Sequence, residues 1–108
     1  MQVTQSSINS ATVLELNGRL NIQTAGELEK VVDRVISNGS LHLVFACEGL
    51  EYCSSAGLRV FLAAVKRLSQ SGGKVVFAAL SPSVREVFEI AGFLEVMNIQ
   101  PDIDSAVQ

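Results

Sequence analysis

The chain has 108 residues, of which 48% are apolar and 18% are charged, and its formal net charge is -3 at pH 7. This length fits one domain with a real hydrophobic core, and the low charged content argues against a disordered chain. No cluster of Lys and Arg could neutralise phosphates or anionic lipid headgroups, so we expect no nucleic-acid partner and no binding to an anionic membrane surface. The aromatic content of 6%, with no Trp, predicts an aliphatic core.

The N-terminal residues show no basic stretch followed by an apolar run, and the apolar runs are too short to span a bilayer. We therefore expect no membrane insertion and a cytoplasmic protein. Cys47 and Cys53 do not form a CxxC pair, and His42 could not complete a zinc site with them at a standard spacing. The sequence thus predicts two reduced thiols, a packed histidine, no metal and no cofactor.

The chain begins with the pattern of a β-hairpin. Residues 2–18 contain an alternating apolar stretch, and Asn9-Ser10 is the predicted turn. Gly18 is the predicted end of the second strand.

A helix is predicted next, because apolar residues recur at helical spacing from position 28 to position 36. Thr24 is the predicted N-cap, with Glu27 three residues later completing a capping box. Asn38-Gly39 is the predicted stop signal.

Residues 41–47 form a nearly continuous apolar run, which is typical of a strand covered on both faces. Apolar residues from Leu58 to Leu68 then predict a second helix, ended by Gly72-Gly73. Another buried strand is predicted over residues 74–80.

A third helix is predicted to start at Ser81-Pro82 and to end at Gly92. Residues 95–99 predict a short last strand, and Asp102 or Asp104 could cap a terminal helical turn.

Strands that alternate with helices indicate right-handed crossovers and parallel strands. The prediction is an α/β fold with one domain over residues 1–108. It has a mostly parallel central sheet of about four to five strands, an N-terminal β-hairpin, and helices packed on the sheet.

The stretch "LEYCSSAGLRVF" places two serines where a strand leads into the second helix. Functional groups collect at the carboxyl ends of strands in open α/β sheets. The structural interpretation is that a serine caps the helix and that Gly57 allows close packing against the sheet. A hydrolase is not expected, because no GxSxG elbow occurs and His42, inside a strand, is the only histidine. We therefore predict no enzyme activity and no catalytic residue.

The remaining interpretation is a hydroxyl that another protein modifies. A phosphoserine at a helix N-terminus is tolerated locally, because free amides and the helix dipole favour an anion. It nevertheless adds nearly two negative charges to a surface that docks a partner.

Three segments carry a family resemblance: "NGRLNIQTAGEL", "LEYCSSAGLRVFLAAVKRL" and "GGKVVFAALSPSVREVFEIAGF". They resemble the STAS domain family, specifically its stand-alone bacterial anti-sigma factor antagonists, and they cover about half of the chain in the family's order.

The resemblance implies partner switching. The unphosphorylated protein would bind an anti-sigma factor that is also a serine kinase of the histidine-kinase-like ATPase type. Phosphorylation would release it, and a metal-dependent serine phosphatase would restore the unmodified form. The family pattern places the acceptor at Ser55, with Gly57 as the motif glycine and Ser54 as a secondary candidate. Ser54 and Asn21 both stand where Asp is common in the family.

The implied partner surface consists of the loop of residues 19–24, the turn of residues 54–58 and the exposed side of the second helix, near Arg59 and Lys66. Its members are Arg19, Asn21, Thr24, Ser54, Ser55, Gly57, Leu58 and Arg59. Two alternatives stay open. One is an unphosphorylated STAS interaction subunit of a signalling or lipid-transport complex. The other is a small-ligand binder, although no phosphate-binding loop occurs.

Overall fold

A computed structural model describes residues 1–108 and shows a five-stranded sheet with helices on both faces. The strands are β1 (Gln2–Ile8), β2 (Ala11–Leu20), β3 (His42–Cys53), β4 (Lys74–Ala78) and β5 (Asn98–Gln100). The helices are α1 (Ala25–Ser37), α2 (Ser55–Gln70), α3 (Pro82–Ile90) and α4 (Ile103–Ala106). The strands lie in sequence order, β1 antiparallel to β2 and all other pairs parallel. The predicted fold class is confirmed.

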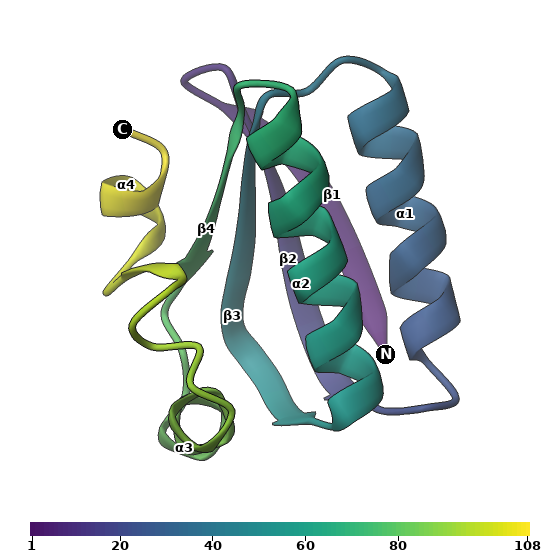
Figure 1. Ribbon diagram of the computed structural model, residues 1–108, viewed down its shortest axis with the longest axis vertical. Helices are drawn as coiled ribbons and strands as arrows, with labels where there is room; N and C mark the ends of the chain where they lie inside the picture. The colour runs from purple at the N-terminus through teal and green to yellow at the C-terminus, as the bar shows by residue number, and fades with distance from the viewer.

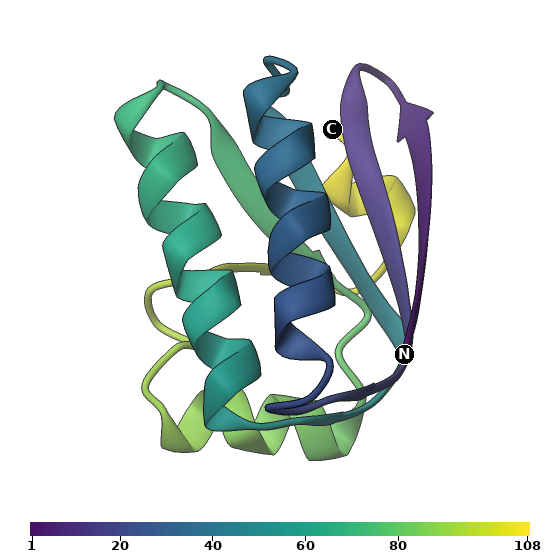
Figure 2. The same ribbon diagram turned by 90° about the vertical axis from the view of Figure 1, so that its right-hand side faces the viewer.

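Helices α1 and α2 lie side by side on one face of the sheet, and α4 lies on the other (Figures 1 and 2). Helix α3 crosses below the sheet, at the same end as the start of α2. The α1–α2 pair carries the chain's one ion pair, between Arg67 and Asp33. None of the four helices is long and apolar enough to cross a bilayer.

The main core lies between the sheet and helices α1, α2 and α3. Its members are mostly aliphatic, as predicted, but its centre is not. Phe45, Phe61, Phe77 and Phe88 are fully buried and contact one another, with ring centroids 4.8 to 5.9 Å apart. Composition alone could not show that these few rings come from different elements and meet at one point.

The hairpin turn is confirmed. Asn9 and Ser10 have φ values of 51° and 69°, so both are left-handed, as a two-residue type I′ turn requires. The prediction that Gly18 ends the second strand is wrong. Gly18, with a φ of 113°, sits at a register shift against β3, and β2 continues to Leu20. Such a bulge bends a strand without ending it.

The third strand is also longer than predicted, because it runs to Cys53 and not to residue 47. Only His42–Ala46 pairs with β4, so the remainder of β3 pairs with β2 alone. The second part of β3 is not a continuous apolar run, so the apolar pattern that predicts the first part does not reveal it.

Two other boundaries differ slightly. Strand β4 ends at Ala78, and β5 is the three-residue stretch Asn98–Gln100 instead of residues 95–99. The predicted cap of α3 is confirmed, since the Ser81 hydroxyl accepts from the Val84 N–H. Asp102 is the cap of α4, and its carboxylate accepts from the Ser105 N–H.

Candidate functional site

The paired ends of β2 and β3 extend beyond the rest of the sheet as a two-stranded ribbon, residues 17–20 and 49–53. Leu20 lies opposite Cys53, and the Ser54 N–H donates to the Leu20 carbonyl at 2.9 Å. The β2–α1 loop and the start of α2 follow the two ends of the ribbon and therefore lie side by side, at the lower end of the molecule in Figures 1 and 2. In the sequence, only the family resemblance predicts that these two segments form one surface.

The β2–α1 loop is organised by a capping box, but three residues earlier than predicted. The Asn21 side-chain oxygen accepts from the N–H groups of Gln23 and Thr24, at 2.9 and 3.1 Å. In return, the Thr24 hydroxyl accepts from the Asn21 N–H at 2.9 Å, and it also donates to the Arg19 carbonyl at 2.8 Å. The predicted Thr24–Glu27 box is wrong, because the Thr24 side chain makes no cap bond to α1.

The capping box fixes the loop before α1, since each of its polar side chains is held by hydrogen bonds to main chain. Within this fixed loop Ile22 is 82% exposed, more than any other large apolar residue in the chain. Its sequence neighbourhood gave no signal, because a single apolar residue in a polar loop has no periodicity. Arg19 is exposed at the end of β2, with its guanidinium 4.4 Å from the Tyr52 ring centre.

Ser55 is the first residue of α2, and it is exposed. Ser54 occupies the N-cap position, with extended backbone angles, but its side chain makes no cap bond. The Ser54 hydroxyl oxygen is buried and has no hydrogen-bond partner. The simple capping interpretation of the serines is therefore wrong at the level of the side chain. The first amides of α2 have neither an intrahelical acceptor nor a side-chain cap.

Gly57 packs the start of α2 onto the ribbon, as the sequence predicted. A Cβ atom at this position would lie 2.6 Å from the Leu20 Cγ and 3.0 Å from the Cys53 Sγ. Only glycine permits this approach. Gly57 is buried and shapes the surface without being part of it, whereas Leu58 is half-buried and Arg59 is exposed.

The two cysteines are free and buried, and neither is a reactive thiol. Burial raises the pKa of the Cys53 thiol to about 12, and the pKa of Cys47 is also raised, by burial and by its proximity to Cys53. A thiol with a raised pKa holds little of the nucleophilic thiolate at neutral pH. His42 is a packing residue, as predicted, and its Nε2 lies 2.8 Å from the Ala106 carbonyl oxygen.

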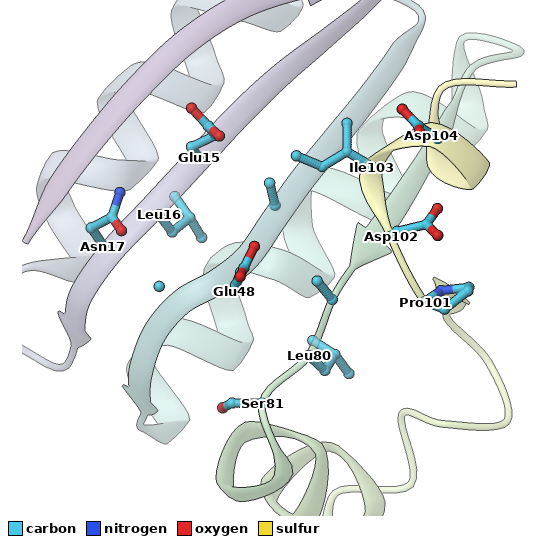
Figure 3. Close-up of a pocket in the computed structure, with 13 residues that line it drawn as sticks. Glu15, Leu16, Asn17, Glu48, Leu80, Ser81, Pro101, Asp102, Ile103 and Asp104 are labelled. Atoms are coloured by element: carbon cyan, nitrogen blue, oxygen red, sulfur yellow. The ribbon is translucent and has the colours of Figure 1, made fainter.

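The largest hollow of the molecule lies elsewhere, on the face of the sheet that carries α4 (Figure 3). This groove has a volume of about 880 Å³ and is lined by residues of β2, β3, the loop after β4 and the start of α4. Its ionisable residues are all acidic: Glu15, Glu48, Asp102 and Asp104. It holds no nucleophile with an adjacent base, and the Asp102 carboxylate is occupied as a helix cap. The chain contains no group of His, Cys, Asp or Glu that could hold a metal ion.

The site at the ribbon presents an exposed hydroxyl and an exposed apolar side chain on a surface formed by two segments of the chain. Ser55 is an exposed hydroxyl beside uncapped amides, next to a fixed loop with an exposed isoleucine, and Arg59 is exposed one turn further along α2. The Ser54 hydroxyl has no hydrogen-bond partner, so no histidine or carboxylate is bonded to it as a base.

Comparison with known proteins identifies the family of this chain. A model of the STAS domain family matches residues 2–106. BtrV of Bordetella bronchiseptica, which is named as an anti-sigma factor antagonist, is 37% identical over 106 residues, covering 98% of this chain and 91% of BtrV.

Solved structures with this fold include a Thermotoga maritima protein that is also named as an anti-sigma factor antagonist. Its TM-score is 0.91 at 23% identity, over 96% of this chain and 90% of that protein. The anti-sigma factor antagonist SpoIIAA in its unphosphorylated form gives a TM-score of 0.84 at 20% identity, over 98% of this chain and 93% of SpoIIAA. The phosphorylated form of Bacillus SpoIIAA gives 0.76 at 19% identity, over 98% and 96%.

The likeness to these structures establishes the fold, and the match of the family model over nearly the whole chain establishes the family. Anti-sigma factor antagonists of this family are regulatory binding proteins and not enzymes, which agrees with a site that holds a serine but no base. The chain belongs to the STAS domain family, among relatives named as anti-sigma factor antagonists.

Proposed function

We propose that this protein is an anti-sigma factor antagonist that acts by partner switching in the cytoplasm. Its unphosphorylated form binds an anti-sigma factor that is also a serine kinase of the histidine-kinase-like ATPase type. Phosphorylation of Ser55 releases that partner, and a metal-dependent serine phosphatase restores the binding form. The cytoplasmic location follows from the need for ATP and fits two free thiols.

The chemistry belongs to the partners. The Ser55 Oγ attacks the γ-phosphorus of ATP, so an Oγ–P bond forms while the bond from that phosphorus to the β,γ-bridging oxygen breaks. ADP leaves, and the hydroxyl proton passes to a base of the kinase. In the reverse direction the phosphatase adds water across the Oγ–P bond, which yields inorganic phosphate and free serine.

One observation carries the proposal: Ser55 is exposed at the first position of α2, directly beside the fixed β2–α1 loop. A kinase can reach this hydroxyl without unfolding the domain. A phosphate there adds nearly two negative charges to the middle of the surface that the two segments form. Like charge and desolvation then oppose docking of a partner selected for the neutral surface.

The geometry also supports Ser55 over Ser54 as the acceptor. The Ser54 hydroxyl oxygen is buried, and its phosphorylation would require the start of α2 to open first. Ser54 occupies the position where the family often has Asp, and its buried hydroxyl keeps this position neutral.

A second candidate is an unphosphorylated interaction subunit. The observation that favours it is Ile22, because a rigid exposed isoleucine serves a permanent interface as well as a switched one. Both candidates use the same surface, and only the modification separates them.

The test is the intact mass of the protein isolated from its native host, followed by peptide mapping across residues 50–66. A phosphate on Ser55 in some growth or stress condition, absent in a Ser55→Ala strain, is the expected result. An unmodified mass in every condition would favour the permanent interaction subunit. A phosphate on Ser54 alone would overturn the assignment of the acceptor.

A further inference from the structure

Arg59 stands one helical turn after Ser55 on the same helix. Residues at i and i+4 of a helix are neighbours on its surface, with Cβ atoms about 5–6 Å apart. Helical side chains lean toward the N-terminus, so the Arg59 side chain leans over the turn that begins with Ser55. Arg59 is exposed and free, because the chain's one ion pair is Arg67–Asp33.

The start of α2 provides a further set of donors for an anion. Its first amides are uncapped, the Ser54 hydroxyl makes no hydrogen bond, and the first turn contains no acidic residue. An oxyanion placed on Ser55 therefore meets backbone donors, the positive end of the helix dipole and a guanidinium.

We propose that Arg59 clamps the phosphate of phosphorylated Ser55 within the same helix. This inference rests on the proposed function, since it concerns the phosphorylated form of that site. The planar guanidinium binds phosphate oxygens in a bidentate manner, which a lysine at this position could not reproduce.

The clamp changes what phosphorylation does to the partner surface. In the unmodified protein the guanidinium is free to meet a carboxylate of the partner. In the phosphorylated protein it is paired internally, so the surface gains a negative charge and loses a positive one together. Phosphorylation then stabilises α2 while it weakens docking.

The experiment uses protein with phosphoserine incorporated at position 55 during translation, so it depends on no cellular kinase. The second ionisation of the phosphate is followed by ³¹P NMR during a pH titration at low salt. Arg59→Gln is compared with Arg34→Gln, which removes the same charge from the last turn of α1, at the opposite end of the helix pair. Other charged groups at this end of the molecule are the same in both variants; they are Arg19, Glu27 and Glu51, and Arg85, Glu86 and Glu89 of α3.

We expect Arg59→Gln to raise the phosphate pKa by at least roughly 0.3 unit relative to both the parent and Arg34→Gln, since a neighbouring cation favours the dianion. The difference should fade at about 1 M salt, where exposed charges are screened. Phosphorylation should also raise the thermal midpoint more in the parent than in Arg59→Gln.

Equal phosphate pKa values in Arg59→Gln and Arg34→Gln would overturn the clamp and leave the proposed function intact. Conversely, a clamp measured in this defined protein, together with an unmodified mass in cells, would refute the switch and not the clamp chemistry.

Discussion

Replacing Gly57 with Ala tests whether the close packing of α2 on the ribbon organises the site. The new Cβ would lie 2.6 Å from the Leu20 Cγ and 2.7 Å from its Cδ2, well inside van der Waals contact. Overpacking of a buried position by a methyl group costs about 1–3 kcal/mol, whereas Ala in place of Gly in a helix gains about 0.5–1 kcal/mol. The net expectation for Gly57→Ala is a loss of about 1–2 kcal/mol in the free energy of unfolding.

Gly26 is the matched control. It lies in the first turn of α1, and a Cβ atom there would meet nothing within 4 Å. Gly26→Ala should therefore stabilise the protein slightly, because it reduces the freedom of the unfolded chain without creating a clash. Urea unfolding followed by circular dichroism gives both free energies on one scale.

The second part of this test concerns Leu20. If the clash is with Leu20, truncating that residue to Ala should remove part of the clash. The double variant should then lose less stability than the sum of the losses in the two single variants. Equal stabilisation by Gly57→Ala and Gly26→Ala would refute the packing argument. Simple additivity with Leu20→Ala would place the strain elsewhere.

Four further predictions concern the loop, the serine and the buried thiol. Ser55→Asp should unfold at nearly the parental urea midpoint but lose binding to the partner kinase, measured by calorimetry; binding at parental strength would contradict the charge switch. Ile22→Ala should weaken the same complex by roughly tenfold or more, because an isoleucine that becomes buried in an interface contributes about 1.5–3 kcal/mol. Ile90→Ala on α3, where the isoleucine is 80% exposed but lies outside the proposed surface, should change the affinity less than about twofold. Asn21→Ala removes the capping box and should cost about 1 kcal/mol in urea unfolding; a cost near zero would show that the loop does not need the box. Burial raises the pKa of the Cys53 thiol to about 12, so this thiol should resist an aromatic disulfide reagent at neutral pH until the protein unfolds. The free energy of unfolding should fall once the pH rises above about 9, because the thiol of the unfolded chain then ionises while that of the folded protein stays protonated. Rapid labelling of the folded protein would refute the burial of Cys53.

The element order could be predicted from the sequence because the signals were local and strong. The Asn9-Ser10 turn, the Ser81 cap and the apolar periodicity of α2 each depend on residues within a few positions of one another. The ribbon could not be predicted in this way. The continuation of β2 past Gly18 depends on pairing with a segment of β3 more than thirty residues away.

The candidate site likewise combines features that local sequence predicts with features that depend on tertiary contacts. The close approach at Gly57 followed from the motif and from helix geometry. Thr24 is the N-cap residue of α1, as predicted, but its side chain pairs with Asn21 and not with Glu27, because the tertiary path of the loop decides which neighbour it meets. The buried Ser54 hydroxyl and the exposure of Ile22 depend on which surfaces meet, and a single sequence carries no signal for that.

The ribbon also explains how a modification at Ser55 can be severe for an interface and mild for the fold. Cys53 and Leu20 end the two strands and anchor the site to the main core, where both are buried. Ser55 lies just beyond this anchor, outside the part of the sheet where β3 pairs on both sides. A phosphate there changes the charge of the surface without disturbing the register of the sheet. Leu20 and Cys53 face the core and hold the ribbon in place, whereas Ser55 faces solvent, so a change of charge at Ser55 leaves the residues that stabilise the ribbon unaltered.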